Sequence, residues 1–420
     1  MAPNPALVKS IEKLNYRVTV GDVAARAGLN LNQTQKQLLA LASDVGGNLQ
    51  VADTGEIVYV FPHNINLILF NKFWRLRFQD WAGKVWKGVF YLIRISFGIV
   101  LVISIAFISL VIIAVIIASA IASMSNSDSN DSGGDFNFSM PDFFWIFSPG
   151  YESNYYQEQG KVERGNAPKK QLNFLESIFS FLFGDGNPNY DLEERRWRTV
   201  ATVIKNNGGA ITAEQLAPYL DNINPSNQEN EDYVIPVLSR FNGLPQVSPE
   251  GGIIYNFPDL QVTAKKRKVK SVTPYLKEKN WKFSNATSGQ IMWAIGLGGA
   301  NIILALVLGN MIRTGAIDVI GDFSAFVTSI YTFLLAYAGG FLGIPLIRYL
   351  VIQSRNKKVD GRNRLRESRT ELLNQPSRQL QAKINYSREF AGQKVITAED
   401  ITYSTERDIL EQEIERLEGE

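Results

Sequence analysis

The residues that could do chemistry are few, and the most suggestive group lies between Asp185 and Asp191. Four oxygen-bearing side chains alternate there, as the ligands of a calcium-binding loop do: Asp185, Asn187, Asn189 and Asp191. The sixth position lacks the glycine of such a loop, and Arg196 stands where a bidentate glutamate is expected. A turn that caps the following helix explains these residues more simply, so we expect no metal here.

The composition argues against most catalytic and cofactor chemistry. The 420 residues contain no cysteine and a single histidine, His63, which removes most transition-metal, haem, iron-sulfur and thiol chemistry. The sequence contains no Walker-type glycine loop, no paired-histidine metal helix and no Gly-x-Ser-x-Gly motif. We therefore expect a protein that is not an enzyme and binds no cofactor.

Three long stretches lack any charged residue, and each exceeds the length of about 20 helical residues that a bilayer requires. They are Ile95–Met124, Phe283–Ile312 and Phe323–Ile347. Burial in a soluble core is the alternative, but soluble helices rarely stay uncharged for so long. Small residues four apart, Ala305 and Gly309 in the second stretch and Gly339 and Gly343 in the third, predict close packing of these helices on each other or on a partner.

Aromatic and basic residues flank these stretches. The segment Asn66–Phe90 predicts an interfacial helix, although an amphipathic helix packed on a soluble module is the alternative. Its expected membrane-interface residues are Trp74, Arg75, Arg77, Trp81, Lys84, Trp86 and Lys87. The expected contacts with anionic lipid are Lys265, Lys266, Arg267, Lys268, Lys357, Lys358, Arg362 and Arg364. Membrane lipids and other membrane or membrane-associated proteins are thus the expected partners.

The sequence contains an internal repeat of one soluble unit, at Thr19–Pro62 and Thr212–Pro258. The second copy follows the first at an offset of 193 from the opening Thr and of 196 through the closing strand-turn-strand pattern. Two short helices followed by a hairpin predict a winged-helix-like module. The expected fold class is mainly α, with α-helical membrane segments plus two winged-helix-like α+β soluble modules.

These features predict six segments, in the following order. They are a first winged-helix-like module at 1–63, an interfacial helix and first membrane segment at 64–124, a linker with short aromatic runs at 125–190, a second winged-helix-like module at 191–260, a basic flank and membrane helical hairpin at 261–353, and a charged C-terminal tail at 354–420. The aromatic runs are Phe136–Phe147 and Phe174–Phe183, and both are too short to span a bilayer. In the tail, Ala398–Ile401 and Glu406–Glu418 predict a charged helix with an apolar stripe.

Charge argues against nucleic acid as the partner of the repeated unit. The first copy, Tyr16–His63, has three basic and four acidic residues, and the second, Asp191–Pro258, has five basic and nine acidic residues. Binding that depends on counterion release from phosphates requires a basic surface, so protein contacts are the expected use of these modules.

The basic flanks also predict an orientation. Cations at Lys265–Lys282 and Arg348–Arg369 indicate that the last two apolar stretches form a hairpin with both ends on the cytoplasmic or stromal side. A single crossing by the first stretch would put the two modules on opposite faces. We favour both modules on the cytoplasmic or stromal face. In that case the first stretch enters the membrane and returns to the same face, or the basic flanks do not set the orientation of this chain.

Three motifs carry a resemblance to a known group: Ser177–Asn189, Ala217–Asp221 and Ile401–Asp408. They resemble a family of cyanobacterial and plastid membrane proteins often labelled as iron-sulfur cluster biosynthesis proteins. The resemblance implies a thylakoid or cytoplasmic membrane of cyanobacteria, or a plastid membrane. It does not imply cluster chemistry, because a chain without cysteine has no thiolate ligands.

The function expected from these patterns is that of a non-catalytic integral membrane scaffold or an assembly or regulatory factor that recruits protein partners. A membrane-tethered winged-helix transcription regulator is the first alternative. A small-solute transporter or channel is the second, although no Asp, Glu or Lys inside the apolar stretches marks an ion path.

Overall fold

The computed structural model describes residues 3–72, 74–125, 172–221, 223, 231–265 and 269–406. It is mainly helical, with long apolar helices and small, mostly antiparallel sheets. The chain forms two compact units. The module unit comprises Met1–Phe90, Gly186–Lys282 and Leu350–Glu420, and the apolar unit comprises Tyr91–Asp185 and Phe283–Tyr349.

The first repeat is a set of three helices closed by a hairpin. Its elements are α1 (Pro5–Lys13), β1 (Arg17–Thr19), α2 (Val20–Ala27), α3 (Leu31–Val45), β2 (Asn48–Ala52) and β3 (Ile57–Val60). The side chains of Asn4, Thr19 and Asn30 accept backbone N–H groups at the starts of the three helices, which satisfies donors that the helix leaves unpaired. Helices α2 and α3 each end at a glycine in the left-handed region, Gly28 and Gly46.

The second repeat has the same order of helices and strands. Its elements are α7 (Leu192–Asn206), β4 (Ala210–Thr212), α8 (Ala213–Leu216), η2 (Ala217–Tyr219), η4 (Asp232–Val234), α9 (Ile235–Phe241), β5 (Leu244–Val247) and β6 (Ile253–Asn256). Val18 lies opposite Tyr59 in the first sheet, and Ile211 lies opposite Tyr255 in the second. The strand pairing therefore repeats at the offsets of 193 and 196 found in the sequence.

Part of the first repeat packs into the core of the second, while most apolar residues of the first repeat form a cluster of their own. Ala24, Ala25 and Leu31 of the first repeat belong to the same buried cluster as Val200 and Ile204 of α7. Helix α10 (Pro258–Gln261) also packs on α2. Because a bilayer cannot pass through this packed contact, we expect both repeats on one face of it. The contact therefore argues against the arrangement with the repeats on opposite faces.

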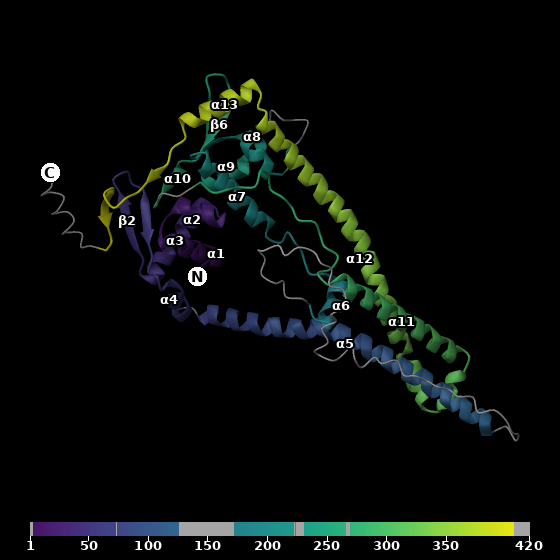
Figure 1. Ribbon diagram of the computed structural model, residues 1–420. Coiled ribbons are helices and arrows are strands. Elements are labelled where there is room, and N and C mark those ends of the chain that lie inside the picture. Colours follow the sequence, from purple (N-terminus) through teal and green to yellow (C-terminus); the bar gives the residue numbers. More distant parts are fainter. Residues whose placement is uncertain are drawn as a thin grey trace, which may run out of the picture. The chain divides into compact units, whose positions relative to one another are not determined.

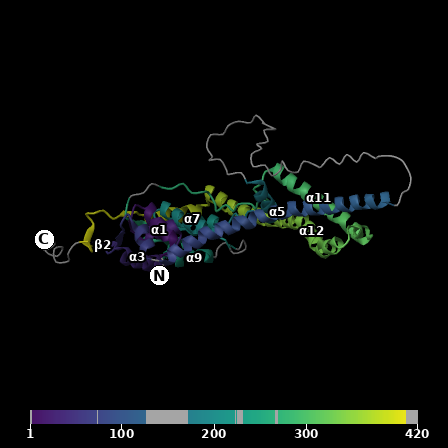
Figure 2. The ribbon, with the colours of Figure 1, turned by 90° about the horizontal axis from the view of Figure 1, so that it is seen from below.

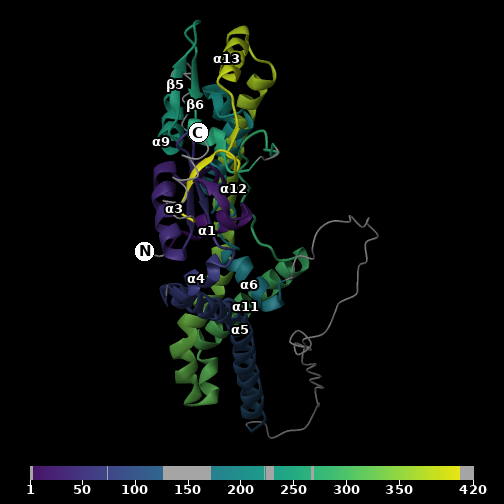
Figure 3. The same cartoon turned by 90° about the vertical axis from the view of Figure 1, so that its left-hand side faces the viewer.

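The C-terminal part folds back onto both repeats. Helix α13 (Arg378–Glu389) lies beside β6, as Figures 1 and 3 show. Strand β8 (Lys394–Val395) pairs in parallel with β7 (Val262–Thr263), and β9 (Ile401–Ser404) pairs antiparallel with β2. The first sheet thus has the order β1-β3-β2-β9, while the second has β4-β6-β5.

The predicted charged helix in the tail is wrong at Ala398–Ile401 and at Glu406, where the chain forms turns and the start of β9. Ile401 begins a strand because the edge of β2 offers backbone hydrogen bonds and because Ile401 packs against a small apolar cluster that contains Ile396. The predicted helix from residue 407 onward lies outside the described residues.

The apolar unit contains the long helices. They are α5 (Trp74–Ser125), α6 (Phe174–Phe183), α11 (Ser288–Arg313), η5 (Ala316–Ile320) and α12 (Phe323–Asn374), of which α5 and α12 continue into the module unit. In the described part of the chain, three helices are long and apolar enough to cross a membrane: α5, α11 and α12. Buried residues of all three form one cluster, and Figure 2 shows α11 crossing the second half of α5.

The segment expected to be one interfacial helix is helical on both sides of residue 73, as α4 (Ile65–Lys72) and as α5 from Trp74 onward, and residue 73 itself lies outside the described residues. Ile65 and Leu69 of α4 are buried in the first repeat. Helix α12 continues past residue 353, the expected end of the membrane hairpin, because a change from apolar to charged residues does not interrupt a helix when those residues are good helix formers. The aromatic run Phe136–Phe147 lies outside the described residues, and Phe174–Phe183 forms α6.

Candidate functional site

A basic hollow on the module unit is the strongest candidate for a functional site. Three adjoining cavities of about 80, 350 and 260 Å³ share Thr202 and Lys270 in their linings. We call this hollow the basic groove. Its lining contains eight cationic side chains: Lys9, Lys13, Arg26, Arg195, Arg198, Lys205, Lys270 and Lys277. Asp22 is the single carboxylate among the described residues that line it.

Helix α7 supplies one wall of the basic groove because its two faces differ. Arg195, Arg198, Thr202 and Lys205 recur at the three- and four-residue spacing that places side chains on one face of a helix. The opposite face carries Val200, Ala201 and Ile204, which are fully buried in the shared core. Burial of that apolar face therefore fixes the direction in which the cations point.

The first repeat supplies the facing wall, and Gly28 sets how closely it approaches α7. Gly28 has a φ of 70°, and a Cβ built there would lie 3.1 Å from the backbone nitrogen of Arg198. Arg240 donates from Nε and Nη2 to the carbonyl oxygen of Gly28, at 3.1 and 2.8 Å, and lies over the Trp197 ring at 4.3 Å. This contact brings Arg26, near the end of α2, to the same groove as Arg198.

A buried carboxylate joins the two repeats beneath the groove. The side chain of Asp22 is 0% exposed and accepts hydrogen bonds from Lys205 Nζ at 2.9 Å, Thr263 Oγ1 at 2.9 Å and the Ala264 amide at 3.0 Å. A buried charge needs such compensation. Lys205 is therefore committed to Asp22, while Arg195 pairs with Asp191 at 3.0 Å, and Arg198 pairs with Glu194.

Glu278 and two arginines of α12 form a second charged cluster in the module unit. Arg362 donates to the two Glu278 oxygens at 2.8 and 2.6 Å, and Arg366 Nη2 lies 2.9 Å from Glu278 and 2.6 Å from Asp221. Burial alone would raise the pKa of the Glu278 carboxyl, but hydrogen bonds and charges from Arg362 and Arg366 hold this pKa below its ordinary value. The cluster is structural, since each of its charges has an opposite partner.

Of the residues predicted to contact anionic lipid, some are exposed to solvent and one belongs to this charged cluster. Lys357, Lys358 and Arg364 are exposed on α12, and Lys265 is exposed after β7. Arg362 is held by Glu278, a partner that the sequence pattern did not indicate. Lys266, Arg267 and Lys268 lie outside the described residues.

The residues predicted at the membrane interface lie along α5. Trp81 and Trp86 are 60% and 64% exposed, and Lys84 and Lys87 are exposed between and beside them. Trp74, Arg75 and Arg77 belong to the same helix, but their side chains fall outside the described ones. Exposure of this kind is compatible with a lipid headgroup layer, so the interface assignment stays a prediction.

Of the predicted packing residues, those on α11 meet another helix. Ala305 is fully buried, and a Cβ at Gly309 would collide with the Tyr331 hydroxyl of α12. Gly298, which the four-residue spacing of small residues did not indicate, also lies at this contact: a Cβ there would be 2.6 Å from the Phe341 ring. A Cβ at Gly339 or Gly343, by contrast, would meet nothing within 4 Å among the described residues, so these two glycines do not make the contact between α11 and α12.

Within the described ranges, no three or more His, Cys, Asp or Glu side chains form a group that could hold a metal ion. The calcium-like segment is instead engaged in local contacts. Asp185 pairs with Arg94 at 2.9 Å and accepts from the Asn285 amide at 2.8 Å. Asn189 donates to the Lys279 carbonyl oxygen at 2.7 Å, as a residue that fixes a turn does.

Comparison with known proteins gave one close similarity. No family model matches the chain, and no solved structure matches it. A protein of Arabidopsis thaliana named "Uncharacterized protein At5g03900, chloroplastic" is 37% identical over 428 aligned residues, which cover 97% of this chain and 79% of the relative. The similarity thus includes both repeats, the long apolar helices and most of the C-terminal part.

Proposed function

This chain belongs to the family of the Arabidopsis thaliana chloroplastic protein At5g03900, and we propose that it is a non-catalytic scaffold or assembly factor anchored in a photosynthetic-type membrane. The observation that carries the proposal is the joining of two repeats and the C-terminal strands in one compact unit. Such a body presents fixed surfaces to partners, and apolar helices of the same chain provide the anchor.

We propose a winged-helix-like fold for each repeat, on the basis of its helix-strand-helix-helix-strand-strand order. In that fold α3 and α9 would be the helices that read DNA. Their surfaces favour protein contacts instead. Leu39 of α3 is 54% exposed, Ile235 of α9 is 56% exposed, and Arg240 of α9 is engaged with Gly28 and Trp197. Lys36 alone adds positive charge to α3, too little for binding driven by counterion release.

The proposed location is a thylakoid or plastid membrane, or a cyanobacterial cytoplasmic membrane, with both repeats on the stromal or cytoplasmic face. The basic flanks of α11 and α12 support this orientation. The proposed role includes no binding of an iron-sulfur cluster, because the chain has no cysteine to supply thiolates.

Affinity purification from native membranes in mild detergent tests the scaffold role. Defined proteins should co-purify with the wild-type chain and be depleted with the double variant Leu39→Asp, Ile235→Asp. Leu372→Asp is the matched control, because Leu372 is 60% exposed on α12 and belongs to neither helix. Failure to recover any specific protein with the wild-type chain would exclude the scaffold role.

A further inference from the structure

The outer edge of β2 in the first repeat differs from the equivalent edge in the second repeat. Strand β9 pairs with β2, whereas no further strand pairs with β5 among the described residues. The two hairpins correspond at the offset of 196, so β2 and β5 are equivalent strands. A sheet edge that presents unpaired N–H and C=O groups is a template for another strand, so the donors of the two edges can be compared.

The two edges differ in the backbone donors that they offer. The Ala52 amide donates to the Glu56 carbonyl oxygen at 2.9 Å and so faces β3, and the Ser248 amide faces β6 in the same way. Because the direction alternates along a strand, the odd-numbered residues face outward. They are Leu49, Val51 and Asp53 in the first repeat, and Pro245, Val247 and Pro249 in the second. Proline has no N–H, so the second edge is protected against pairing, and the first edge is not.

Strand β9 uses the donors that the first edge retains. The Leu49 amide donates to Thr405 Oγ1 at 2.9 Å, and the Thr405 amide donates to the Leu49 carbonyl oxygen at 3.0 Å. At the other end of the strand, the Asp53 amide donates to the Asp400 carbonyl oxygen at 2.9 Å. Backbone groups along the outer edge of β2 therefore hold an extended segment.

A single apolar side chain anchors β9. Ile401 packs against a cluster whose four buried residues are at most 4% exposed: Ala52, Val58, Ala264 and Ile396. Thr402 is exposed, and Tyr403 belongs to none of the described apolar clusters. Backbone pairing together with one side chain in a pocket is the way in which a peptide strand binds to the edge of a sheet.

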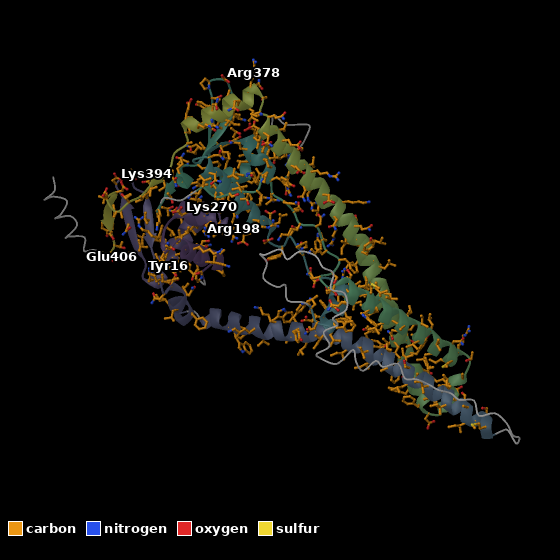
Figure 4. The ribbon with its side chains drawn as sticks, viewed as in Figure 1. Tyr16, Arg198, Lys270, Arg378, Lys394 and Glu406 are labelled. Atoms are coloured by element: carbon orange, nitrogen blue, oxygen red, sulfur yellow. The ribbon has the colours of Figure 1, made fainter. Side chains whose placement is uncertain are left out.

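The connection before β9 separates it from the rest of the C-terminal part. Ile396 is buried, and its amide donates to the Thr263 carbonyl oxygen at 3.0 Å. Residues 397–399 are exposed between this fixed point and β9. Figure 4 labels Lys394 before this connection and Glu406 after β9. Because only exposed residues join the two strands, β9 can detach while β8 stays paired.

We propose that the outer edge of β2 binds an extended segment of a partner protein, and that β9 competes for this edge from within the same chain. The partner segment pairs antiparallel with β2 and places an aliphatic side chain where Ile401 lies. Recruitment of the partner then depends on the release of β9. This inference specifies how the scaffold holds a partner, so it rests on the proposed scaffold role.

Binding of a peptide to the full-length chain tests the proposal. The probe is a fluorescent peptide with the sequence of residues 398–406, and fluorescence anisotropy measures its binding to the chain in phosphatidylcholine nanodiscs. Ile401→Asp puts a charge against the apolar cluster and releases β9, so this variant should bind the peptide about tenfold more tightly than the wild type does. The matched control is Thr402→Asp, which changes an exposed residue of the same strand and should bind as the wild type does.

A second variant releases β9 without a change in any apolar cluster. Since the Thr405 amide faces β2, the Tyr403 amide faces β2 as well, and the Ser404 amide faces away. Tyr403→Pro removes the donor that faces β2, so this chain should also bind the peptide more tightly than the wild type does.

Two peptide analogues test whether binding uses the strand edge. In the peptide, N-methylation at Tyr403 should weaken binding to the Ile401→Asp chain about tenfold, because it removes a hydrogen bond to β2. N-methylation at Ser404, whose amide faces away, should leave binding unchanged.

Three results would overturn the proposal. The first is equal peptide binding by the Ile401→Asp, Tyr403→Pro and Thr402→Asp chains. The second is equal weakening by the two N-methylated peptides. The third is a dimer of the wild-type chain that Ile401→Asp separates, which would show that the edge serves strand exchange between copies. The peptide assay needs no natural partner, so its failure would leave the scaffold role standing, whereas failure of the affinity purification would leave the binding edge standing.

Discussion

Among the described cations of the module unit, Arg366 is the most deeply buried, with a side chain 1% exposed. Its Nη2 pairs with Asp221 and Glu278, and its Nη1 donates to the Leu276 carbonyl oxygen at 2.9 Å. Two residues before it, Arg364 is exposed on the same helix. Residues of one cationic run thus have different surroundings: Arg366 holds α12 against the second repeat, whereas Arg364 remains exposed and available to lipid.

Replacing Arg366 should therefore destabilise the chain far more than replacing Arg364. In Arg366→Met, the buried Glu278 keeps only Arg362 as an ion-pair partner, and Asp221 loses its ion pair with Arg366. This loss should lower the free energy of unfolding by about 3–5 kcal/mol. Arg364→Met should change it by less than about 0.5 kcal/mol. Denaturant titration of the purified chain in detergent, followed by tryptophan fluorescence, measures both. Similar midpoints for the two variants would contradict the structural role of Arg366.

The sequence shows that a cationic run is present, but it does not show which of its residues form buried ion pairs and which are exposed. Composition and position after an apolar stretch predicted lipid contact for Arg362 and Arg364 alike. The distinction depends on carboxylates far away in the chain, since Arg366 and Asp221 are 145 residues apart. Such pairings carry no local pattern, so they could not be predicted from the residues around them.

At the scale of elements, the repeated unit was the part most open to prediction. Strand pairs, their register and the three-residue difference between copies follow from turn residues and alternating apolar positions, which are local signals. The basic groove was missed because charge was counted within Tyr16–His63 and Asp191–Pro258. Lys9, Lys13 and Lys270 lie outside those limits, and the structure brings them to the junction.

The junction depends on Gly28, and Gly46 offers a matched comparison. Both glycines end a helix in the left-handed region, with φ of 70° and 68°, so alanine at either position should cost about 1–2 kcal/mol of stability. At Gly28 the added Cβ also presses on Arg198 and Trp197, whereas at Gly46 it meets nothing within 4 Å among the described residues. Gly28→Ala should therefore lower the unfolding free energy by about 1 kcal/mol more than Gly46→Ala, measured by denaturant titration. Equal losses would show that the contact between α2 and α7 adds nothing.

At the scale of the molecule, the packed contact between the repeats bears on a question of topology that the sequence left open. The basic flanks indicated one face for the ends of α11 and α12, while the first apolar stretch pointed to a crossing that would separate the repeats. Those two indications conflict only if the repeats are independent domains. Ala24 and Ala25 pack with Val200 and Ile204, so we expect the repeats to share one face.

Cysteine labelling tests this topology directly, because the chain has no native cysteine. Lys36→Cys on α3 and Glu250→Cys in the turn between β5 and β6 report on the two repeats, and Asp318→Cys reports on the connection between α11 and α12. All three positions are exposed.

In sealed membrane vesicles, an impermeant maleimide should label Lys36→Cys and Glu250→Cys from the same side. Asp318→Cys should react only from the opposite side, since two membrane-spanning helices bring their connection to the far face. Labelling of Lys36→Cys and Glu250→Cys from opposite sides would be incompatible with the packed contact between the repeats, and access to Asp318→Cys from the side of the repeats would mean that α11 and α12 do not span the bilayer.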